Sequence, residues 1–315
     1  MNDIQNTIII GSGPAGLTAG IYASRAEIKP MLIAGLNPGG QLMQTTEVEN
    51  FPGFKDGIQG PELMQNMISQ AMRFGTKIVH ENVESLDLSQ KPFTVKTDKA
   101  EYKTHTIILA MGADANWLNL PSEQRLRGKG VSACATCDGF FFKNKHVVVV
   151  GGGDAAMEEA IFLTKYASKV TMLHRSESYK ASKIMLARAQ ANPKIEFKHN
   201  VQVVEVIGAD RVEAVKLKNT INGAEDVFAC DGMFVAIGHT PNSSILKQKV
   251  KLDEKGYAEV ENHTHVIVSE DTHTNVEGVF VAGDLSDPRY RQAVTAAGMG
   301  AIRCGQHPGN RRGSL

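Results

Sequence analysis

Cysteine is scarce in this sequence, since four residues in 315 are too few for the disulfide framework of a secreted protein. No apolar run approaches the ~20 residues that cross a bilayer. The N-terminus has no basic segment followed by an apolar stretch and a cleavage site. Lys and Arg number 34, as do Asp and Glu, so no excess charge favours nucleic acid or a membrane surface. We therefore expect a cytoplasmic protein, in which a disulfide is usually transient and catalytic.

The first glycine-rich motif is Gly11-Ser-Gly13-Pro-Ala-Gly16. The β-branched residues 7–10 before it predict a buried parallel strand. Residues 17–25 after it have helical character, and residues 30–33 are typical of the next strand. This order is the context that a dinucleotide-binding G-x-G-x-x-G motif requires. We expect a pyrophosphate here, where a helix N-terminus favours negative charge.

Each glycine of that motif has a separate task. Gly11 allows the tight turn, Gly13 lets backbone N–H groups approach the pyrophosphate, and Gly16 lets helix and strand pack closely. The acidic residue that often closes the second strand and binds ribose is missing, because the strand ends in Ala34-Gly35. This absence weakens an interpretation of the first site as a generic NAD site.

The same pattern recurs in the middle of the chain. Residues 147–150 predict a strand, and Gly151-Gly-Gly153-Asp-Ala-Ala156 has small residues at the three key positions. A helix over 155–166 and a strand over 169–173 are expected to follow.

Basic rather than acidic residues follow that last strand. His174 and Arg175 come directly after it and Lys180 soon afterwards, with no carboxylate at the strand end. Cations at this place suit the 2′-phosphate of NADPH and favour it over NADH. The alternative is that Arg175 and Lys180 are solvated surface charges.

The second motif is predicted to lie in an inserted domain. With 42% hydrophobic and 22% charged residues, the chain has the material for two globular domains. Apolar strands at 106–110 and 232–237 each lead into a connector that we interpret as a hinge. We predict an α/β fold of two Rossmann-like nucleotide-binding domains, with residues 114–240 inserted into a discontinuous domain made of 1–113 and 241–315.

A further strand at 279–282 returns to the discontinuous domain and ends in Gly283-Asp284. A carboxylate at the C-terminal end of a strand can accept a hydrogen bond from a ribityl hydroxyl. It can also cap the helix that follows, and both roles are compatible.

Between the two glycine-rich motifs lies Cys134-Ala-Thr-Cys137-Asp138. A C-x-x-C pair is either a redox disulfide or half of a zinc site, and no second Cys or His pair stands at zinc-ligand spacing. Cys230 and Cys304 are far apart and are expected to be ordinary core or surface residues. Beside two nucleotide sites, the pair indicates an electron path through two nucleotides to sulfur, as in a flavin-dependent disulfide reductase.

Together these motifs resemble those of the bacterial-type, low-molecular-weight thioredoxin reductases over nearly the whole chain. The resemblance rests on their number, order and spacing, since one alone would be weak support. The matching motifs are G-S-G-P-A-G at 11–16, G-G-Q-L at 39–42, T-E-V-E-N at 46–50, C-A-T-C-D at 134–138, G-G-G-x-x-A at 151–156, A-G-D at 282–284 and Y-R-Q-A at 290–293.

The resemblance implies FAD on the discontinuous domain, NADPH on the inserted domain, thioredoxin as the disulfide substrate, and a homodimer without metal. It assigns to the FAD site Gly11, Ser12, Gly13, Pro14, Ala15, Gly16, Gly39, Gly40, Gln41, Leu42, Thr46, Asn50, Val83, Ala110, Gly112, Asp284, Arg291, Gln292 and Ala293. It assigns to the NADPH site Gly151, Gly153, Asp154, Ala155, Ala156, His174, Arg175 and Lys180.

The resemblance also implies roles for the redox residues. Electrons pass from NADPH to FAD, then to the Cys134–Cys137 disulfide and on to thioredoxin. Cys137 faces the flavin, Cys134 attacks the partner, and Asp138 carries the proton that thiol–disulfide exchange requires. Alternatively, Asp138 is only a turn residue before Gly139. Domain rotation at the two hinges would present nicotinamide and disulfide to the flavin in turn.

Three aromatic residues follow this turn. By family position, Phe140 and Phe141 are expected to dock the partner, with Lys129 as an ionic contact. The alternative is that Phe140, Phe141 and Phe142 belong to the core of the next strand.

The phosphate-binding residues depart from the family pattern. The family's H-R-R-x-x-x-R is here His174-Arg175-Ser176 with Lys180. Lys does not give the bidentate grip of Arg on phosphate, so we expect a weaker preference for NADPH.

Two further departures lie in the discontinuous domain. The common A-T-G-A turn is here Ala110-Met111-Gly112-Ala113. After Gly300 we expect little helical character, because Gly305, Pro308 and Gly309 break the helix that the family has there.

Two other functions compete with a disulfide reductase. A flavin-dependent dithiol oxidase, which passes electrons to oxygen, would not need the intact second motif at 151–156. A non-catalytic flavoprotein that senses nucleotide redox state would not need Cys134, Cys137 and Asp138 together.

Overall fold

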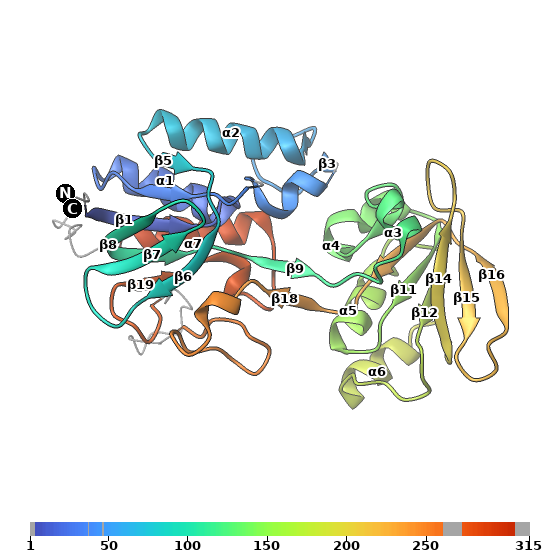
Figure 1. Cartoon of the computed structure of the whole chain (residues 1–315). Helices are drawn as coiled ribbons and strands as arrows, with labels where there is room; N and C mark the ends of the chain where they lie inside the picture. Colours follow the sequence, from blue (N-terminus) through green and yellow to red (C-terminus); the bar gives the residue numbers. More distant parts are fainter. Residues whose placement is uncertain (1–3, 37, 46, 261–272, 306–315) are drawn as a thin grey trace. The chain divides into compact units, whose positions relative to one another are not determined.

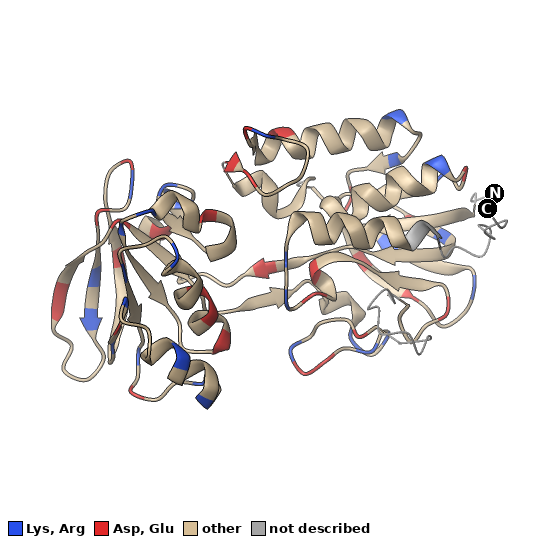
Figure 2. Cartoon of the chain, turned by 180° about the vertical axis from the view of Figure 1, so that it is seen from behind, with Lys and Arg blue, Asp and Glu red and all other residues tan. Residues whose placement is uncertain are grey.

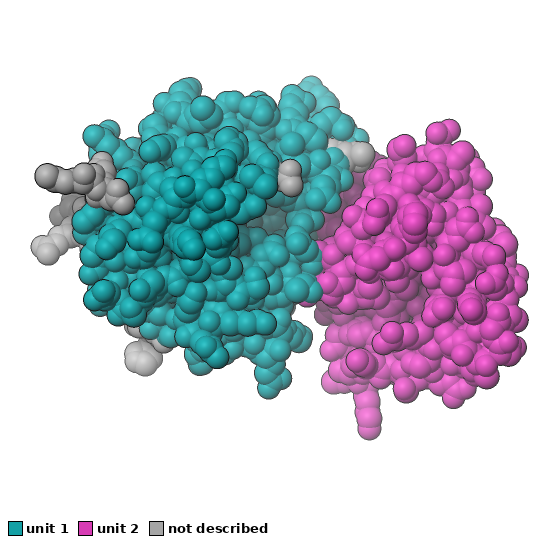
Figure 3. Space-filling view, viewed as in Figure 1, with its two compact units in different colours: residues 1–114, 240–315 teal, residues 115–239 magenta. Residues whose placement is uncertain are grey.

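The computed structural model describes residues 4–36, 38–45, 47–260 and 273–305. The chain divides into two compact units (Figure 3): Met1–Asp114 with Thr240–Leu315 form unit 1, and Ala115–His239 form unit 2. The predicted domain boundaries differ from these by one residue at each crossing. The chain passes between the units in β9 (Ala113–Ala115) and β18 (His239–Pro241), and these two strands pair with each other.

Unit 1 is built around a seven-stranded sheet in the order β5-β2-β1-β8-β7-β6, with β19 also paired to β8 (Figure 1). β5, β2, β1, β8 and β19 run parallel, and β7 and β6 are antiparallel. The strands are β1 (Gln5–Ile10), β2 (Met31–Ile33), β5 (Lys77–Val79), β6 (Val83–Asp87), β7 (Phe93–Thr97), β8 (Glu101–Leu109) and β19 (Val279–Val281), and β3 (Glu47–Val48) and β4 (Ile58–Gln59) pair separately.

The central strand β1 shows why this sheet has two buried faces. Ile9 packs with residues of the helices on one face, whereas Ile8 and Ile10 pack with β7 and β19 on the other, and all three are buried. Successive side chains of a strand point to opposite faces, so a continuous β-branched run suits a strand covered on both sides. The predicted buried parallel strand is confirmed.

One helix of unit 1 packs directly on this sheet, and two others pack on that helix. α1 (Pro14–Arg25) contacts β1, β2 and β8, and both α2 (Gly60–Arg73) and α7 (Ala293–Gly305) pack on α1. The short 3₁₀ segments are η1 (Gly40–Gln44), η3 (Ser244–Leu246) and η4 (Gly283–Leu285).

The expectation of little helical character after Gly300 is wrong up to Gly305, the last residue that the structure describes, because α7 covers Ala293–Gly305. The reason is the close packing of α7 on α1. A Cβ at Gly300 would overlap the carbonyl oxygen of Ala15, so the two backbones meet directly, and this contact outweighs the weak helix propensity of the segment. Pro308 and Gly309 lie outside the described residues.

Unit 2 contains a five-stranded parallel sheet, β10-β17-β11-β12-β13, and a three-stranded antiparallel sheet, β14-β15-β16. In β11, Val147 and Val149 pack towards α5, and Val148 and Val150 pack on the opposite face. The strands are β10 (Val131–Ser132), β11 (His146–Val150), β12 (Lys169–Leu173), β13 (Ile195–Lys198), β14 (Val201–Ile207), β15 (Ala214–Asn219), β16 (Glu225–Ala229) and β17 (Gly232–Val235). The helices are α3 (Pro121–Leu126), α4 (Ala135–Asp138), η2 (Gly139–Phe142), α5 (Asp154–Leu163) and α6 (Lys183–Gln190).

The predicted α/β class with Rossmann-like β–α–β elements is confirmed in both units. Four predicted elements end one to three residues too late, two of them by a single residue, since β8 ends at Leu109 and β19 at Val281. β17 ends at Val235, and α5 ends at Leu163, since the Thr164 hydroxyl donates to the carbonyl oxygen of Ile161 at 2.7 Å. A side-chain bond of this kind competes with the helix ladder at its end.

Lys and Arg are interspersed with Asp and Glu over both units (Figure 2), as the balanced count leads one to expect. Ion pairs such as Lys216–Glu225 join exposed side chains and contribute little each. Of the helices in the described part of the chain, none combines the length and apolar character needed to cross a membrane.

Candidate active site

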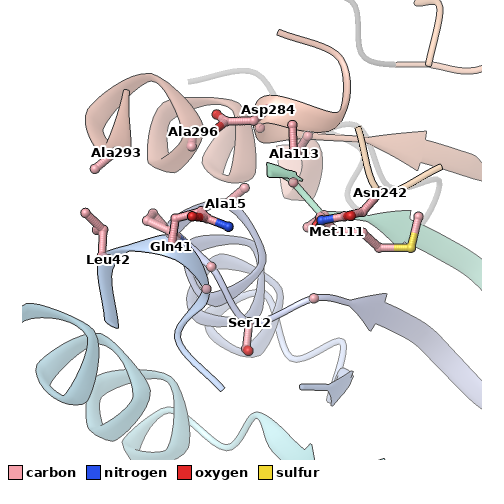
Figure 4. A pocket seen from close by; sticks show the side chains of 18 of the residues that line it. Ser12, Ala15, Gln41, Leu42, Met111, Ala113, Asn242, Asp284, Ala293 and Ala296 are labelled. Atoms are coloured by element: carbon pink, nitrogen blue, oxygen red, sulfur yellow. Dashed lines mark hydrogen bonds between the residues drawn. The ribbon is translucent and has the colours of Figure 1, made fainter. Parts of the chain in front are cut away.

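Unit 1 contains a cavity of about 270 Å³ at the C-terminal ends of its parallel strands. Figure 4 shows residues of widely separated segments converging on it, among them Ser12, Gln41, Asn242 and Asp284. The lining consists of Gly11, Ser12, Gly13, Pro14, Ala15, Ala34, Gly40, Gln41, Leu42, Ala110, Met111, Gly112, Ala113, Asp114, Asn242, Ala282, Gly283, Asp284, Arg291, Gln292, Ala293 and Ala296.

The first wall is the glycine turn between β1 and α1. A Cβ at Gly11 would overlap the carbonyl oxygen of Ala110, and one at Gly16 would overlap that of Gly11. A Cβ at Gly13 would meet nothing within 4 Å. Gly13 also begins α1 without any side-chain cap, so the first N–H groups of the helix remain available. Two glycines therefore serve the fold, and the third keeps an open approach to a helix N-terminus, as an anion requires.

The second wall is held to this turn by Ser12. The Ser12 hydroxyl donates to the carbonyl oxygen of Ala34 at 2.9 Å and accepts from the N–H of Gly39 at 3.0 Å. Gly39 has φ +107°, a conformation that glycine adopts readily. These contacts bring Gln41 and Leu42 of η1 to the cavity.

The third wall comes from the segment after β19. Burial, with a contribution from nearby Asp287, raises the pKa of Asp284 to about 7, and Arg291 opposes the shift. Asp287 is itself buried and accepts hydrogen bonds from the backbone N–H groups of Arg289, Tyr290 and Arg291 at 2.8–3.0 Å. A fixed turn therefore places Arg291 and Gln292 beside a carboxyl group that suits a hydroxyl ligand.

Most residues assigned to the FAD site line this cavity, and four of the described ones do not. Gly16 and Gly39 support its walls. Asn50 lies next to it, because its Nδ2 donates to Oε1 of Gln292 at 3.1 Å. Val83 is half-buried at the start of β6. Thr46 lies outside the described residues.

Sequence reasoning missed a wall formed where the chain crosses between the units. Asn242 donates from its backbone N–H to the carbonyl oxygen of Gly112 at 3.0 Å and from Nδ2 to that of Met111 at 3.1 Å. Nε2 of Gln41 donates to the carboxylate of Asp114. Only the proximity of Asn242 and Asp114 to the predicted hinges could have indicated these residues.

The raised pKa of Asp284 predicts a pH-dependent effect of Asp284→Asn on the stability of flavin-free protein. The pKa of Asp284 in the folded state lies above its value of about 3.9 in the unfolded state. The stabilising contribution of this carboxyl group is therefore complete below pH ~3.9 and is lost as the pH rises through about 7. Asn does not ionise. We therefore expect the free energy of unfolding of the variant, relative to that of the wild type, to rise from pH 5 to pH 8. The rise should be up to a few kcal/mol, at about 1.4 kcal/mol per pKa unit. Urea unfolding at both pH values checks this, and a constant difference would contradict it.

Unit 2 repeats the glycine turn between β11 and α5. A Cβ at Gly151 would overlap the carbonyl oxygen of Ala236, whereas one at Gly153 would meet nothing within 4 Å. Gly153 begins α5 without a side-chain cap. Ala155 and Ala156 follow in the first turns of the helix, with Ala156 fully buried. The turn therefore offers the same open helix N-terminus as the turn in unit 1.

The basic residues after β12 lie on a loop next to this turn. Arg175 and Lys180 are exposed, which suits contact with a phosphate. Ser176 differs, because its hydroxyl lies 3.0 Å from Nε2 of His174 and donates to the carbonyl oxygen of Ser178 at 3.2 Å. Its polar group is therefore engaged within the loop.

Cys134 and Cys137 form the predicted disulfide at the start of α4. The N–H of Cys134 donates to the Ser132 hydroxyl at 3.0 Å, and the N–H of Cys137 donates to the carbonyl oxygen of Cys134 at 3.2 Å. Cys137 is exposed and Cys134 half-buried. Both sulfurs thus belong to a tight helical turn at the surface of unit 2.

Asp138 follows the disulfide directly and is only partly exposed. Burial raises the pKa of this carboxyl group, and a hydrogen bond with Ser132 opposes the rise. A carboxyl group that keeps its proton to a higher pH than usual, next to a disulfide, can give and take a proton during thiol chemistry.

The three phenylalanines divide between surface and core. Phe140 and Phe141 are 56% and 40% exposed, whereas Phe142 is buried in the core of unit 2. They belong to η2, not to a strand, so the alternative of a core strand is wrong for the first two. Phe140 packs edge-on against Tyr166, with ring centroids 6.0 Å apart.

The remaining cysteines and charged residues do not form a metal centre in the described part of the chain. No group of three or more His, Cys, Asp or Glu is arranged there to hold a metal ion. Cys230 is a buried free thiol, and burial raises its pKa to about 12, so it is an inert core residue as predicted. The side chain of Cys304 lies outside the described residues.

Comparisons with known proteins agree on one family. Residues 5–300 match the family described as pyridine nucleotide-disulphide oxidoreductase. A thioredoxin reductase of Mycolicibacterium smegmatis is 50% identical over 297 residues, which cover 94% of this chain and 93% of that protein. A bifunctional thioredoxin reductase/thioredoxin of Mycobacterium leprae is 50% identical over 298 residues, 94% of this chain and 64% of the relative. The crystal structure of thioredoxin reductase from Streptococcus pyogenes superposes with a TM-score of 0.90 at 37% identity, covering 98% of both chains.

The family uses a nicotinamide nucleotide and a flavin, for which the two glycine turns and the cavity supply fitting sites. Identity near 50% over almost the full length extends the likeness from the nucleotide turns to the disulfide between them. The chain therefore belongs to the pyridine nucleotide-disulphide oxidoreductases and, within them, to the bacterial-type thioredoxin reductases.

Proposed function

We propose that this protein is an NADPH-dependent thioredoxin-disulfide reductase that carries FAD. The observation that supports it most directly is the surface disulfide Cys134–Cys137 with the carboxyl group of Asp138 beside it. The name of the Mycobacterium leprae relative, which joins reductase and thioredoxin, supports thioredoxin as the substrate. An oxidase that uses oxygen would have no need of the open turn at Gly153.

The unit 1 cavity would hold FAD. Its pyrophosphate would lie at Gly13 and the start of α1, and Asp284 would accept a hydrogen bond from a ribityl hydroxyl. NADPH would bind at Gly153 and the start of α5, with its 2′-phosphate near Arg175 and Lys180. When bound, the two cofactors supply the pair of electrons that reduces the disulfide.

The chain's own residues then perform thiol–disulfide exchange. The Cys134 thiolate attacks one sulfur of the thioredoxin disulfide, so a mixed disulfide forms and the other thioredoxin sulfur leaves as a thiolate. Cys137 next attacks Cys134, which restores the intramolecular disulfide and releases the second thioredoxin sulfur. Asp138 takes the proton of the attacking thiol and returns it to a leaving sulfur. Cys134 is the attacking residue by family resemblance, although Cys137 is the more exposed.

Three further parts of the proposal rest on the same resemblance. Rotation at β9 and β18 would alternate the nicotinamide and the disulfide at the flavin. Phe140 and Phe141, with Lys129, would dock thioredoxin. The enzyme would act as a homodimer in the cytoplasm, where catalytic dithiols are kept reduced.

An anaerobic titration tests this function. The purified protein, loaded with FAD, is titrated with NADPH while the visible flavin absorbance is followed, and oxidised thioredoxin is then added. We expect the absorbance to fall and then to recover in proportion to the thioredoxin added. Recovery only after admission of oxygen would point to an oxidase, and no recovery at all to a non-catalytic flavoprotein.

Arg175→Ala should raise KM for NADPH roughly tenfold and leave NADH kinetics nearly unchanged, because it removes a charge-assisted contact with the 2′-phosphate. Ser176→Arg should strengthen the preference for NADPH over NADH, since it adds a guanidinium to the same loop. Arg188→Ala removes an equal charge from the exposed face of α6 and serves as the control. Equal kcat/KM of the wild type for both nucleotides would show that Arg175 and Lys180 are solvated surface charges.

A further inference from the structure

The loop of residues 175–182, which we call the basic loop, is fastened to the glycine turn of unit 2 through its backbone. The N–H groups of Lys180 and Ala181 both donate to the carbonyl oxygen of Gly152, at 2.8 and 3.1 Å. The N–H of Ser182 donates to Oδ1 of Asp154 at 2.6 Å. Three consecutive N–H groups of the loop are thus held by two residues of the turn.

Asp154 is the first residue of α5, and the helix does not use its side chain as a cap. Its carboxylate instead accepts from Ser182, whose hydroxyl in turn caps α6 by accepting from the N–H of Met185 at 3.4 Å. One carboxylate therefore connects the start of α5, the end of the basic loop and the start of α6.

The other end of the loop is packed on the same turn by His174. Its ring occupies the space into which a Cβ of Gly152 would project. It also stacks on Tyr179, with ring centroids 4.5 Å apart, and its Nε2 lies 3.0 Å from the carbonyl oxygen of Ser178. The exposed side chains of Arg175 and Lys180 therefore extend from a backbone fixed at both ends.

A carboxylate at the start of α5 has an electrostatic cost for a nucleotide site. Asp154 lies one residue after Gly153, where we place the pyrophosphate, and two anions close together repel each other. A direct contact with the pyrophosphate therefore does not account for an acidic residue there. The hydrogen bond to Ser182 does account for it, because a charged acceptor holds a backbone N–H more strongly than a neutral one.

We propose that Asp154 is a positioning residue, which fixes the basic loop so that Arg175 and Lys180 meet the 2′-phosphate. This role rests on the proposed NADPH site. It predicts that selectivity for the 2′-phosphate depends on a residue that does not touch it, because an anchored loop loses less conformational freedom when the phosphate binds.

The test measures binding alone, by calorimetry of the FAD-loaded protein with 2′,5′-ADP and with 5′-AMP. For Asp154→Ala we expect affinity for 2′,5′-ADP to fall on the order of tenfold. Affinity for 5′-AMP should be unchanged or slightly higher, since a negative charge is removed. Asp154→Asn keeps an acceptor oxygen and should fall between the wild type and Asp154→Ala. Glu158→Ala removes a similar charge from an exposed position on α5 and should bind both ligands like the wild type.

Gly152→Ala perturbs the other attachment of the basic loop, because the added methyl group displaces the His174 ring. It should also weaken 2′,5′-ADP more than 5′-AMP. If Asp154→Ala keeps the wild-type ratio of the two affinities, the positioning role is wrong while the NADPH site stands. If the wild type itself binds both ligands equally, the NADPH assignment fails, and the role of Asp154 with it.

Discussion

Replacing either redox cysteine by serine, Cys134→Ser or Cys137→Ser, should reduce thioredoxin turnover to the rate without enzyme, while NADPH still bleaches the bound flavin. Hydride transfer to the flavin precedes sulfur chemistry, so it needs neither thiol. Reduction of a protein disulfide needs both, because one sulfur attacks and the other resolves the mixed disulfide. Anaerobic flavin absorbance and a thioredoxin-coupled assay measure the two half-reactions separately.

The two serine variants also separate the roles of the two sulfurs. With Cys134 as the attacking residue, reduced Cys137→Ser should accumulate a covalent mixed disulfide with a thioredoxin that keeps one active-site cysteine, activated as its thionitrobenzoate mixed disulfide so that the leaving thiol is released, and Cys134→Ser should not. Cys230→Ala is the control, because that thiol is buried in a different core cluster of unit 2 from Ala135 of the disulfide turn, and it should leave both half-reactions unchanged. Near-normal thioredoxin reduction by either serine variant would refute the assigned electron path.

Gly13→Val should yield a folded but colourless protein. The backbone of Gly13, at φ −70° and ψ −178°, is open to any residue, and a Cβ there meets nothing within 4 Å. The valine methyl groups would instead occupy the approach to the start of α1, where the pyrophosphate would lie. We expect loss of almost all bound flavin with little change in the flavin-free melting temperature.

Flavin absorbance per chain and thermal unfolding of the apoprotein check this result. Gly298→Ala is the matched control. Gly298, like Gly13, has free space around its Cβ position, but it is exposed and lies on α7 outside the cavity lining. It should keep the flavin and gain slightly in stability, as Ala is the better helix former. A yellow Gly13→Val protein would place the flavin elsewhere.

The sequence predicts best what depends on local pattern. Runs such as residues 147–150 identify buried strands because both faces of a parallel sheet are covered, and the glycine spacing identifies both turns. The signal for Asp138 was its position after Cys137. Its raised pKa, however, depends on burial in a fold that no local pattern describes.

What the sequence could not predict depends on contacts between distant segments. Gly152 looks like a spacer in the motif, and its importance appears only when the ring of His174 packs against it. The wall that includes Asn242 exists because the chain returns from unit 2 beside Gly112. Helix propensity after Gly300 was a poor guide for the same reason, since α7 packs closely on α1 at Gly300.

The split sequence of unit 1 has a consequence for synthesis on the ribosome. All of Ala115–His239 leaves the ribosome before Thr240–Leu315. Unit 2 therefore has its complete sequence at a time when the first segment of unit 1 still lacks β19, Asp284 and α7. Domains generally fold as units, and N-terminal ones usually fold first. Here the order is inverted: the nucleotide turn that is translated first obtains its last cavity wall only after unit 2 has been translated. Binding of a flavin in this cavity would then follow the synthesis of unit 2.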